Sequence, residues 1–208
     1  MKKRIFDMIV WIMTIVFISG VFFMHDTIPI HWNSQWEVDN YGSRYMMLIV
    51  ASLPILIYYG ILLSKKIDPK KSNFQNKEKT YDLYRYGLTV FFMMLNMLLY
   101  YMILFPQANM QISIFMIMGL LLIGLGNYMP RLPQNYFLGI KTPWTLANEM
   151  VWNKTHRIGG YSFVVMGIVL IFCGFMKSHY MMYILLGYII LEVVGIYVYS
   201  YFVYKKLQ

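Results

Sequence analysis

The sequence predicts an all-α integral membrane protein that has six transmembrane helices and both termini in the cytoplasm. Of the 208 residues, 59% are hydrophobic and only 13% are charged, whereas about a quarter of an average soluble domain is charged. Several apolar runs are long enough to cross a hydrocarbon core of about 30 Å, which takes about 20 helical residues. The positive charge is concentrated in alternate loops, and loops rich in lysine and arginine stay in the cytoplasm.

The helices are expected in six apolar runs, at residues 5–24, 45–63, 84–105, 112–129, 158–176 and 180–204. The first run is longer than the apolar core of about 7–15 residues in a signal peptide, and no cleavage site of small residues follows it, so we expect a helix there. With the N-terminus inside, all but Arg44 and Lys177 of the 18 lysines and arginines fall on the cytoplasmic side. Removing one helix would exchange the sides of every later loop, so this asymmetry supports six spans.

A long outer loop joins the first two helices and carries several histidines and carboxylates. These residues lack the closely spaced pairs of a structural metal site, so no metal is expected. We expect a folded cap in which Pro29 sets an extended path and His31 and Asn33 satisfy backbone groups of the loop. Trp32 and Trp36 are expected to anchor this cap at the outer interface of the membrane.

Two long segments are expected in the cytoplasm. The first, residues 66–83, is rich in lysine and poor in apolar residues, which predicts a solvated linker or a tether to lipid headgroups. The second is residues 130–157, in which Thr142 and Pro143 are typical of a helix N-cap and first residue.

The run at residues 144–157 contains no helix breaker and predicts a short amphipathic helix at the inner membrane interface, ending at Gly159 and Gly160. One interpretation is a simple interfacial connector. The other is that this helix forms one cytoplasmic site with the residues before it, where Pro130 and Gly139 favour an ordered, non-helical path.

Glu192 is a carboxylate about halfway along the last expected helix. A charge at the bilayer centre costs at least about 2.5–3.5 kcal/mol, so such a residue is expected to face the bundle interior, where Asn96 or a tyrosine hydroxyl could be its partner. It could be a neutral acid that joins two helices, or a relay for protons or ions. The second interpretation gives an alternative function, a small ion-coupled transporter or permease.

Enzymatic function is not expected, because the chain has no glycine-rich phosphate loop, nucleophile elbow, HExxH motif or CxxC motif. No cofactor is expected either. The net charge of +9 follows from the cytoplasmic loops, so it does not indicate direct binding of nucleic acid.

The segment PRLPQNYFLGIKTPWTLANEMVWNKTHRIGGYSF resembles the signature of the SdpI-type family of bacterial immunity proteins. In that signature, a P-R-x-x-x-N-x-x-x-G run leads into T-P-W-T-L and then into a V-W-x-x-T-H-R helix. The segment IPIHWNSQWEVDNYGSR resembles a module often found ahead of it, with a P-x-H-[FW]-N core. Trp36 departs from this module, which usually carries glycine there.

The resemblance implies a multi-pass protein of the bacterial cell membrane that protects the cell from a secreted, membrane-active toxin peptide. For some relatives it also implies signal transduction, in which a small cytoplasmic DNA-binding autorepressor is held at the membrane. The implied partners are therefore membrane lipid, the toxin peptide and such a repressor. The implied domains are an N-terminal module at residues 1–65, the linker at 66–83 and an SdpI-like domain at 84–208.

Three sets of candidate site residues follow. The extracytoplasmic recognition set is Pro29, His31, Asn33, Asp39 and Arg44, and the intramembrane polar pair is Asn96 and Glu192. The cytoplasmic signature set is Pro130, Arg131, Asn135, Gly139, Lys141, Thr142, Pro143, Trp144, Thr145, Trp152, His156 and Arg157.

Overall fold

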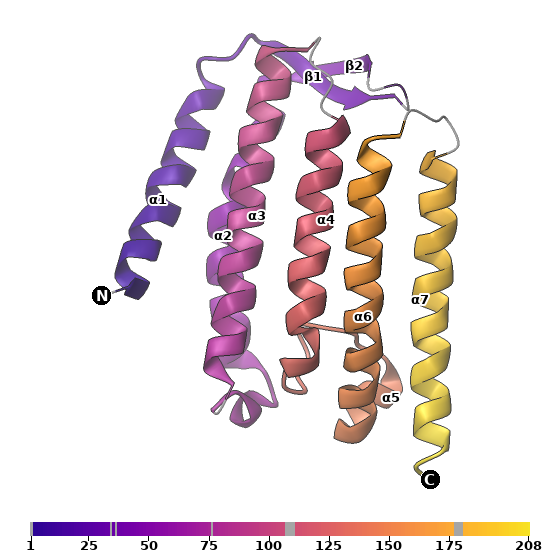
Figure 1. The fold of residues 1–208 in the computed structure, drawn as a ribbon. Coiled ribbons are helices and arrows are strands. Elements are labelled where there is room, and N and C mark those ends of the chain that lie inside the picture. The colour runs from indigo at the N-terminus through magenta and orange to yellow at the C-terminus, as the bar shows by residue number, and fades with distance from the viewer. Residues whose placement is uncertain (1, 34, 36, 76, 107–110, 177–180) are drawn as a thin grey trace.

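The computed structural model describes the chain apart from residues 1, 34, 36, 76, 107–110 and 177–180. Within these described residues, six helices are long and apolar enough to cross a membrane, which confirms the predicted number of spans, and they lie side by side (Figure 1). They are α1 (Lys2–Val21), α2 (Met47–Ile67), α3 (Glu78–Leu104), α4 (Gln111–Tyr128), α6 (Glu149–Gly174) and α7 (Met181–Lys205). The shorter elements are β1 (Thr27–Trp32), β2 (Val38–Ser43), η1 (Arg44–Met46), η2 (Lys71–Phe74), η3 (Met129–Arg131) and α5 (Pro143–Ala147).

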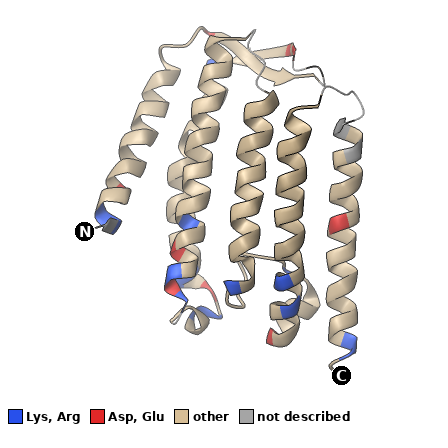
Figure 2. Ribbon diagram, viewed as in Figure 1, with Lys and Arg blue, Asp and Glu red and all other residues tan. Residues whose placement is uncertain are grey.

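The bundle has two different ends. The hairpin of β1 and β2 covers one end, and both chain termini lie toward the other (Figure 1). Most lysines and arginines gather at the end with the termini (Figure 2), which we call the basic end. The side of the membrane that each end faces stays a prediction of the positive-inside rule.

Helices α4 and α6 approach each other most closely, through two pairs of facing glycines. A Cβ atom added to Gly119 would lie 2.5 Å from the carbonyl oxygen of Gly167, and one added to Gly126 would lie 2.6 Å from that of Gly160. The two pairs are about two helical turns apart on each helix. Without side chains at these points, the backbones themselves come into contact, as small residues permit in membrane proteins.

The outer loop forms an antiparallel β-hairpin with irregular register between Pro29 and Trp32. Ile28 of β1 is buried in the same apolar cluster as residues of α1 and α2, including Val21 and Met47. The hairpin is thereby held against the end of the bundle by burial of apolar surface. This agrees with the expected folded cap, and Pro29 lies in extended backbone as expected. Trp36 lies outside the described residues.

The break between α5 and α6 corrects one prediction. The helix expected at residues 144–157 is wrong, because α5 ends at Ala147 and Asn148 adopts extended backbone. The Asn148 side chain accepts hydrogen bonds from the N–H groups of Met150 and Val151 and so begins α6 as its N-cap. The expected stop at Gly159 and Gly160 is also wrong, because α6 continues through both to Gly174.

The lysine-rich segment before α3 corrects a second prediction. It is not freely solvated, because Asp68 and Phe74 are each only 1% exposed. Phe74 packs in a cluster with Ile61 and Tyr81, and η2 makes a compact turn there. Helix α3 consequently begins at Glu78, six residues before its expected start.

Candidate functional site

The exposed part of the hairpin is built around a histidine–carboxylate pair. His31 Nδ1 lies 2.6 Å from Asp39 Oδ1 across the two strands, and these side chains are 65% and 41% exposed. His31 therefore contacts a carboxylate and not the loop backbone groups that we expected it to satisfy. Asn33 does satisfy the backbone, because its Oδ1 accepts hydrogen bonds from the N–H groups of Gln35 and Glu37.

Arg44 holds the base of the hairpin to the end of α1. Its Nη1 donates to the carbonyl oxygen of Met24 at 2.8 Å, and its Nη2 lies 3.3 Å from Asp26 Oδ1. Pro29 is buried. Of the predicted recognition set, only His31 and Asp39 are therefore exposed side chains that the hairpin offers to a ligand. Tyr41, which is 61% exposed on β2, was missed by the sequence analysis.

Asn135 organises the loop between α4 and α5. Its side chain is fully buried, its Oδ1 accepts from the N–H groups of Phe137 and Leu138, and its Nδ2 donates to the carbonyl oxygens of Pro133 and Leu138. An amide side chain is suited to this position because it can accept and donate at once. Any apolar replacement would leave several backbone groups unpaired.

His156 and Trp152 connect this loop to α6. Trp152 Nε1 donates to the carbonyl oxygen of Leu132 at 2.9 Å, and the Trp152 and His156 rings stack with centroids 3.8 Å apart. His156 Nε2 accepts the N–H of Ile140 at 3.0 Å, so this nitrogen carries no proton. The proton is therefore on Nδ1, which donates to the carbonyl oxygen of Trp152 at 2.9 Å. The hydrogen bonds assign a neutral imidazole with both nitrogens engaged.

Gly139 is required next to this imidazole. Its φ of +95° is one that residues with a side chain rarely adopt, and a Cβ atom there would lie 2.3 Å from His156 Nε2. This backbone conformation confirms the predicted ordered, non-helical path at Gly139. Glycine at this position lets Ile140 present its N–H to the ring.

Thr142 and Thr145 begin α5 and join it to α7. Each side chain accepts from the backbone N–H of the other, in a reciprocal capping box. Ser200 of α7 donates to Thr142 Oγ1 at 3.0 Å. Trp144 packs edge-on against Tyr197 and Tyr201 of the same helix, with centroids 4.9 and 5.2 Å away. The start of α5 is thus the predicted N-cap, with Pro143 as first residue.

The signature set divides into a buried scaffold and an exposed rim. The buried members are Asn135, Thr142, Thr145, Trp152 and His156, and the exposed members are Pro130, Arg131, Gly139, Lys141, Pro143 and Arg157; Trp144 is half-buried. Because the buried polar atoms described above are paired, they fix the shape of the segment. Only the rim can contact a partner.

The lysine-rich segment docks onto this same scaffold. Lys70 Nζ lies 2.5 Å from Gln134 Oε1 and 3.0 Å from the carbonyl oxygen of Leu146. Asp68 Oδ2 accepts the N–H of Tyr136 at 2.9 Å. The segment between α2 and α3 therefore ties the N-terminal helices to the signature segment, a link that neither segment's own composition indicates.

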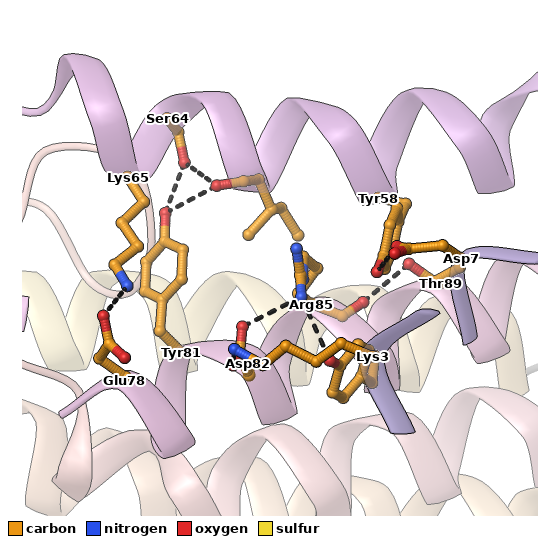
Figure 3. Close-up of polar contacts among 12 residues, drawn as sticks. Lys3, Asp7, Tyr58, Ser64, Lys65, Glu78, Tyr81, Asp82, Arg85 and Thr89 are labelled. Carbon is orange, nitrogen blue, oxygen red and sulfur yellow. Dashed lines mark hydrogen bonds and ion pairs between the residues drawn. The ribbon is translucent and has the colours of Figure 1, made fainter. Parts of the chain in front are cut away.

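A second polar cluster joins α1, α2 and α3 near the basic end (Figure 3). Arg85 is 4% exposed, pairs with Asp82 at 3.1 Å and lies over the rings of Tyr58 and Tyr86, at 4.5 and 5.0 Å. Asp82 also pairs with Lys3 of α1 at 2.8 Å. The buried cation is thus shared between a carboxylate and two aromatic faces, as a charge far from water requires.

The cluster also contains a second ion pair and a hydrogen bond from a phenol to a carboxylate. Lys65 Nζ lies 2.6 Å from Glu78 Oε1, and the Tyr58 hydroxyl donates to Asp7. Because each of these cations faces a carboxylate, the cluster acts chemically as a clamp on three helices. From the sequence, Arg85 was expected only as one of the cytoplasmic charges. The spacing of Asp82 and Arg85, three residues apart on a helix, was the available signal of their pairing.

The predicted intramembrane polar residues do not meet. Asn96 in α3 donates to the carbonyl oxygens of Val50 and Phe92, at 3.0 and 2.9 Å, whereas Glu192 is buried in α7, on the far side of α4 and α6 (Figure 1). The suggested pair is therefore wrong. Within the described part of the chain, Glu192 instead lies near the Ser162 side chain of α6, although neither carboxylate oxygen makes a hydrogen bond of normal geometry.

Comparisons with known proteins agree with this architecture. Residues 131–200, from the signature segment to α7, match the model of the SdpI/YfhL protein family. The chain is 28% identical to immunity protein SdpI of Bacillus subtilis (strain 168) over 211 residues, which cover 100% of this chain and 99% of the relative. No solved structure matches. The similarity extends over both the hairpin half and the signature half. Together with the six helices able to cross a membrane, it supports a multi-pass membrane protein that resembles the SdpI type.

Proposed function

We propose that this protein is a membrane immunity protein that protects a bacterial cell from a secreted, membrane-active toxin peptide. The observation that carries the proposal is the full-length similarity to immunity protein SdpI. It covers the hairpin and the signature segment together, so the relative has a counterpart for both ends of this bundle.

In this proposal the hairpin faces the outside and meets the toxin first. It lies at the end of the bundle opposite the gathered lysines and arginines (Figure 2), which the positive-inside rule puts in the cytoplasm. His31, Asp39 and Tyr41 offer an imidazole, a carboxylate and a phenol within one short hairpin. Such a surface can donate and accept hydrogen bonds while it contacts apolar groups of a peptide.

The signature rim would then contact a cytoplasmic partner, and a small DNA-binding repressor is the candidate. Arg131 and Lys141 are exposed on the segment that the buried scaffold holds in one shape. Signalling would be supported if such a repressor co-purifies with the protein and if the double variant Arg131→Ala, Lys141→Ala reduces its recovery. Lys66→Ala is the control and should leave the recovery unchanged. Equal recovery with all of these variants would restrict the protein to immunity.

The experiment for immunity measures survival of a strain sensitive to a secreted membrane-active peptide. Cells express this chain, with the Bacillus subtilis immunity protein SdpI as the positive control. We expect survival to rise with this chain, and to fall when His31→Ala and Asp39→Ala are combined. His25→Ala is the matched control, because His25 is also exposed but precedes the strands.

Two outcomes would contradict the proposal. The first is no protection by membrane-inserted wild-type chain under conditions where the relative protects. The second, for the role of the hairpin, is full protection by the double variant. The transporter alternative is not favoured by the comparisons, and it predicts liposome flux that disappears in Glu192→Gln, whereas the immunity proposal predicts that this variant still protects.

A further inference from the structure

A cavity of about 600 Å³ lies between α6 and α7 at the basic end of the bundle. One row of residues from each helix lines the cavity. Within each row, successive residues are about one helical turn apart, and the spacing is the same in both rows. The rows include Lys154, Arg157 and Tyr161 on α6, and Tyr199 and Phe202 on α7 with Lys206 directly after its end. Tyr197 and Tyr201, which hold Trp144, are not part of this lining. Helix α5 therefore packs on another face of α7 and leaves the cavity open.

The charge of this cavity is unbalanced. Three cations line it and no carboxylate does. Among the described residues, none of the three has a carboxylate within ion-pair distance. The three-helix cluster of Figure 3 is different, because Lys3, Lys65 and Arg85 are each matched there by an acid. The three cations of the α6–α7 cavity are thus not neutralised by any described carboxylate, as is typical of an anion-binding site. With the residues that the structure describes, they make no ion pair that would stabilise the fold.

The position and the remaining lining identify the kind of anion. The cavity is at the ends of two membrane-spanning helices, where a bilayer places its phosphates. Phe202 and Tyr161 are 61% and 59% exposed, so apolar and aromatic surface adjoins the cations. A free phosphate would use only the cations, whereas a lipid would also cover the rings with its glycerol and acyl groups.

We propose that this cavity binds the phosphodiester headgroup of an anionic phospholipid. Arg157 presents a planar guanidinium that suits paired phosphate oxygens, and Lys154 and Lys206 add point charges from either side. Basic pockets between membrane-spanning helices on the cytoplasmic side commonly bind such headgroups. The cavity volume is within the range of about 300–1,000 Å³ typical of small-ligand sites.

The test uses full-length protein purified in an uncharged detergent. It is titrated with short-chain phosphatidylglycerol, with phosphatidylcholine of the same chain length and with inorganic phosphate, and bound ligand is followed by native mass spectrometry. The cavity variant combines Lys154→Gln, Arg157→Gln and Lys206→Gln. The control variant combines Lys66→Gln, Lys79→Gln and Lys205→Gln, which removes the same charge from exposed positions that do not line the cavity.

Wild type and the control variant are expected to bind phosphatidylglycerol on the order of tenfold more tightly than phosphatidylcholine. The cavity variant is expected to lose this preference. A preference that survives in the cavity variant, or is lost equally in the control, would overturn the proposal. Displacement of the lipid by an equal concentration of inorganic phosphate would assign the site to a soluble anion and overturn it too. If the triple variant does not fold, Arg157→Gln alone gives the same test with a smaller expected loss.

Discussion

Gly126→Ala should destabilise the bundle by forcing α4 away from α6. The new Cβ atom would lie 2.6 Å from the carbonyl oxygen of Gly160 and 2.9 Å from the Cβ atom of Phe163, whereas ordinary contact begins at 3.4 Å. The helices would have to separate by roughly 0.8 Å at this point, because a backbone carbonyl cannot rotate away. Overpacking of this kind costs about 1–3 kcal/mol. Alanine recovers about 1 kcal/mol of helix propensity, so we expect a net loss of up to about 2 kcal/mol.

The matched control is Gly124→Ala, two residues away on the same helix. A Cβ atom at Gly124 meets nothing within 4 Å, so this variant gains helix propensity without a clash. The free energy of unfolding is measured for both variants in mixed detergent micelles, by circular dichroism against increasing denaturing detergent. Equal stability of Gly126→Ala and Gly124→Ala would refute the close contact between α4 and α6.

Three further predictions concern the polar networks, and each is checked by the same unfolding measurement. Thr142→Val should cost about 1–2 kcal/mol, because it removes the N-cap of α5 and the acceptor for Ser200. Gly139→Ala should cost about 1–3 kcal/mol through its positive φ and through displacement of the His156 ring. Asp82→Asn should lower the free energy of unfolding by about 3–5 kcal/mol, because it leaves the buried Arg85 guanidinium without its carboxylate. Lys3→Gln should change the free energy of unfolding little, since the Lys3 side chain is 67% exposed. A larger loss in Lys3→Gln than in Asp82→Asn would contradict the assignment of Arg85 as the centre of the cluster.

The six spans could be predicted because their signal is local. Each is a long apolar run, and length alone distinguishes it from a loop. The N-cap at Thr142 was also predictable, since threonine followed by proline supplies both the capping oxygen and a residue without an N–H to satisfy. The hairpin was predicted only as an ordered cap, because the pairing of β1 with β2 depends on register across the loop, which includes a bulge next to Pro29.

The misplaced helix break has a tertiary cause. Gly159 and Gly160 look like breakers in isolation, but a Cβ atom at Gly159 would meet Ile140 at 2.3 Å, and one at Gly160 would meet the Gly126 carbonyl oxygen at 2.7 Å. These glycines are present for close packing inside a continuous helix. Asn148 begins α6 as its N-cap. It was not identified from the sequence because asparagine is also common in turns and loops.

The polar clusters were the least predictable part. The signature segment is held by contacts over long sequence distances, such as Lys70 with Gln134 and Ser200 with Thr142. Composition made the lysine-rich segment look solvated, and only the fold shows that Asp68 and Phe74 are buried. Periodicity within one segment carries no information on which distant segment will cover it.

The proposed function requires the hairpin and the basic end to face opposite sides of the membrane, and labelling of single cysteines tests this directly. Cys173, which is buried, is replaced in Cys173→Ala, and Glu37→Cys or Lys66→Cys is added at an exposed position. A maleimide that cannot cross the membrane is expected to label Glu37→Cys in intact cells, and Lys66→Cys only after the cells are permeabilised. Labelling of Lys66→Cys in intact cells, with Glu37→Cys protected, would contradict the account.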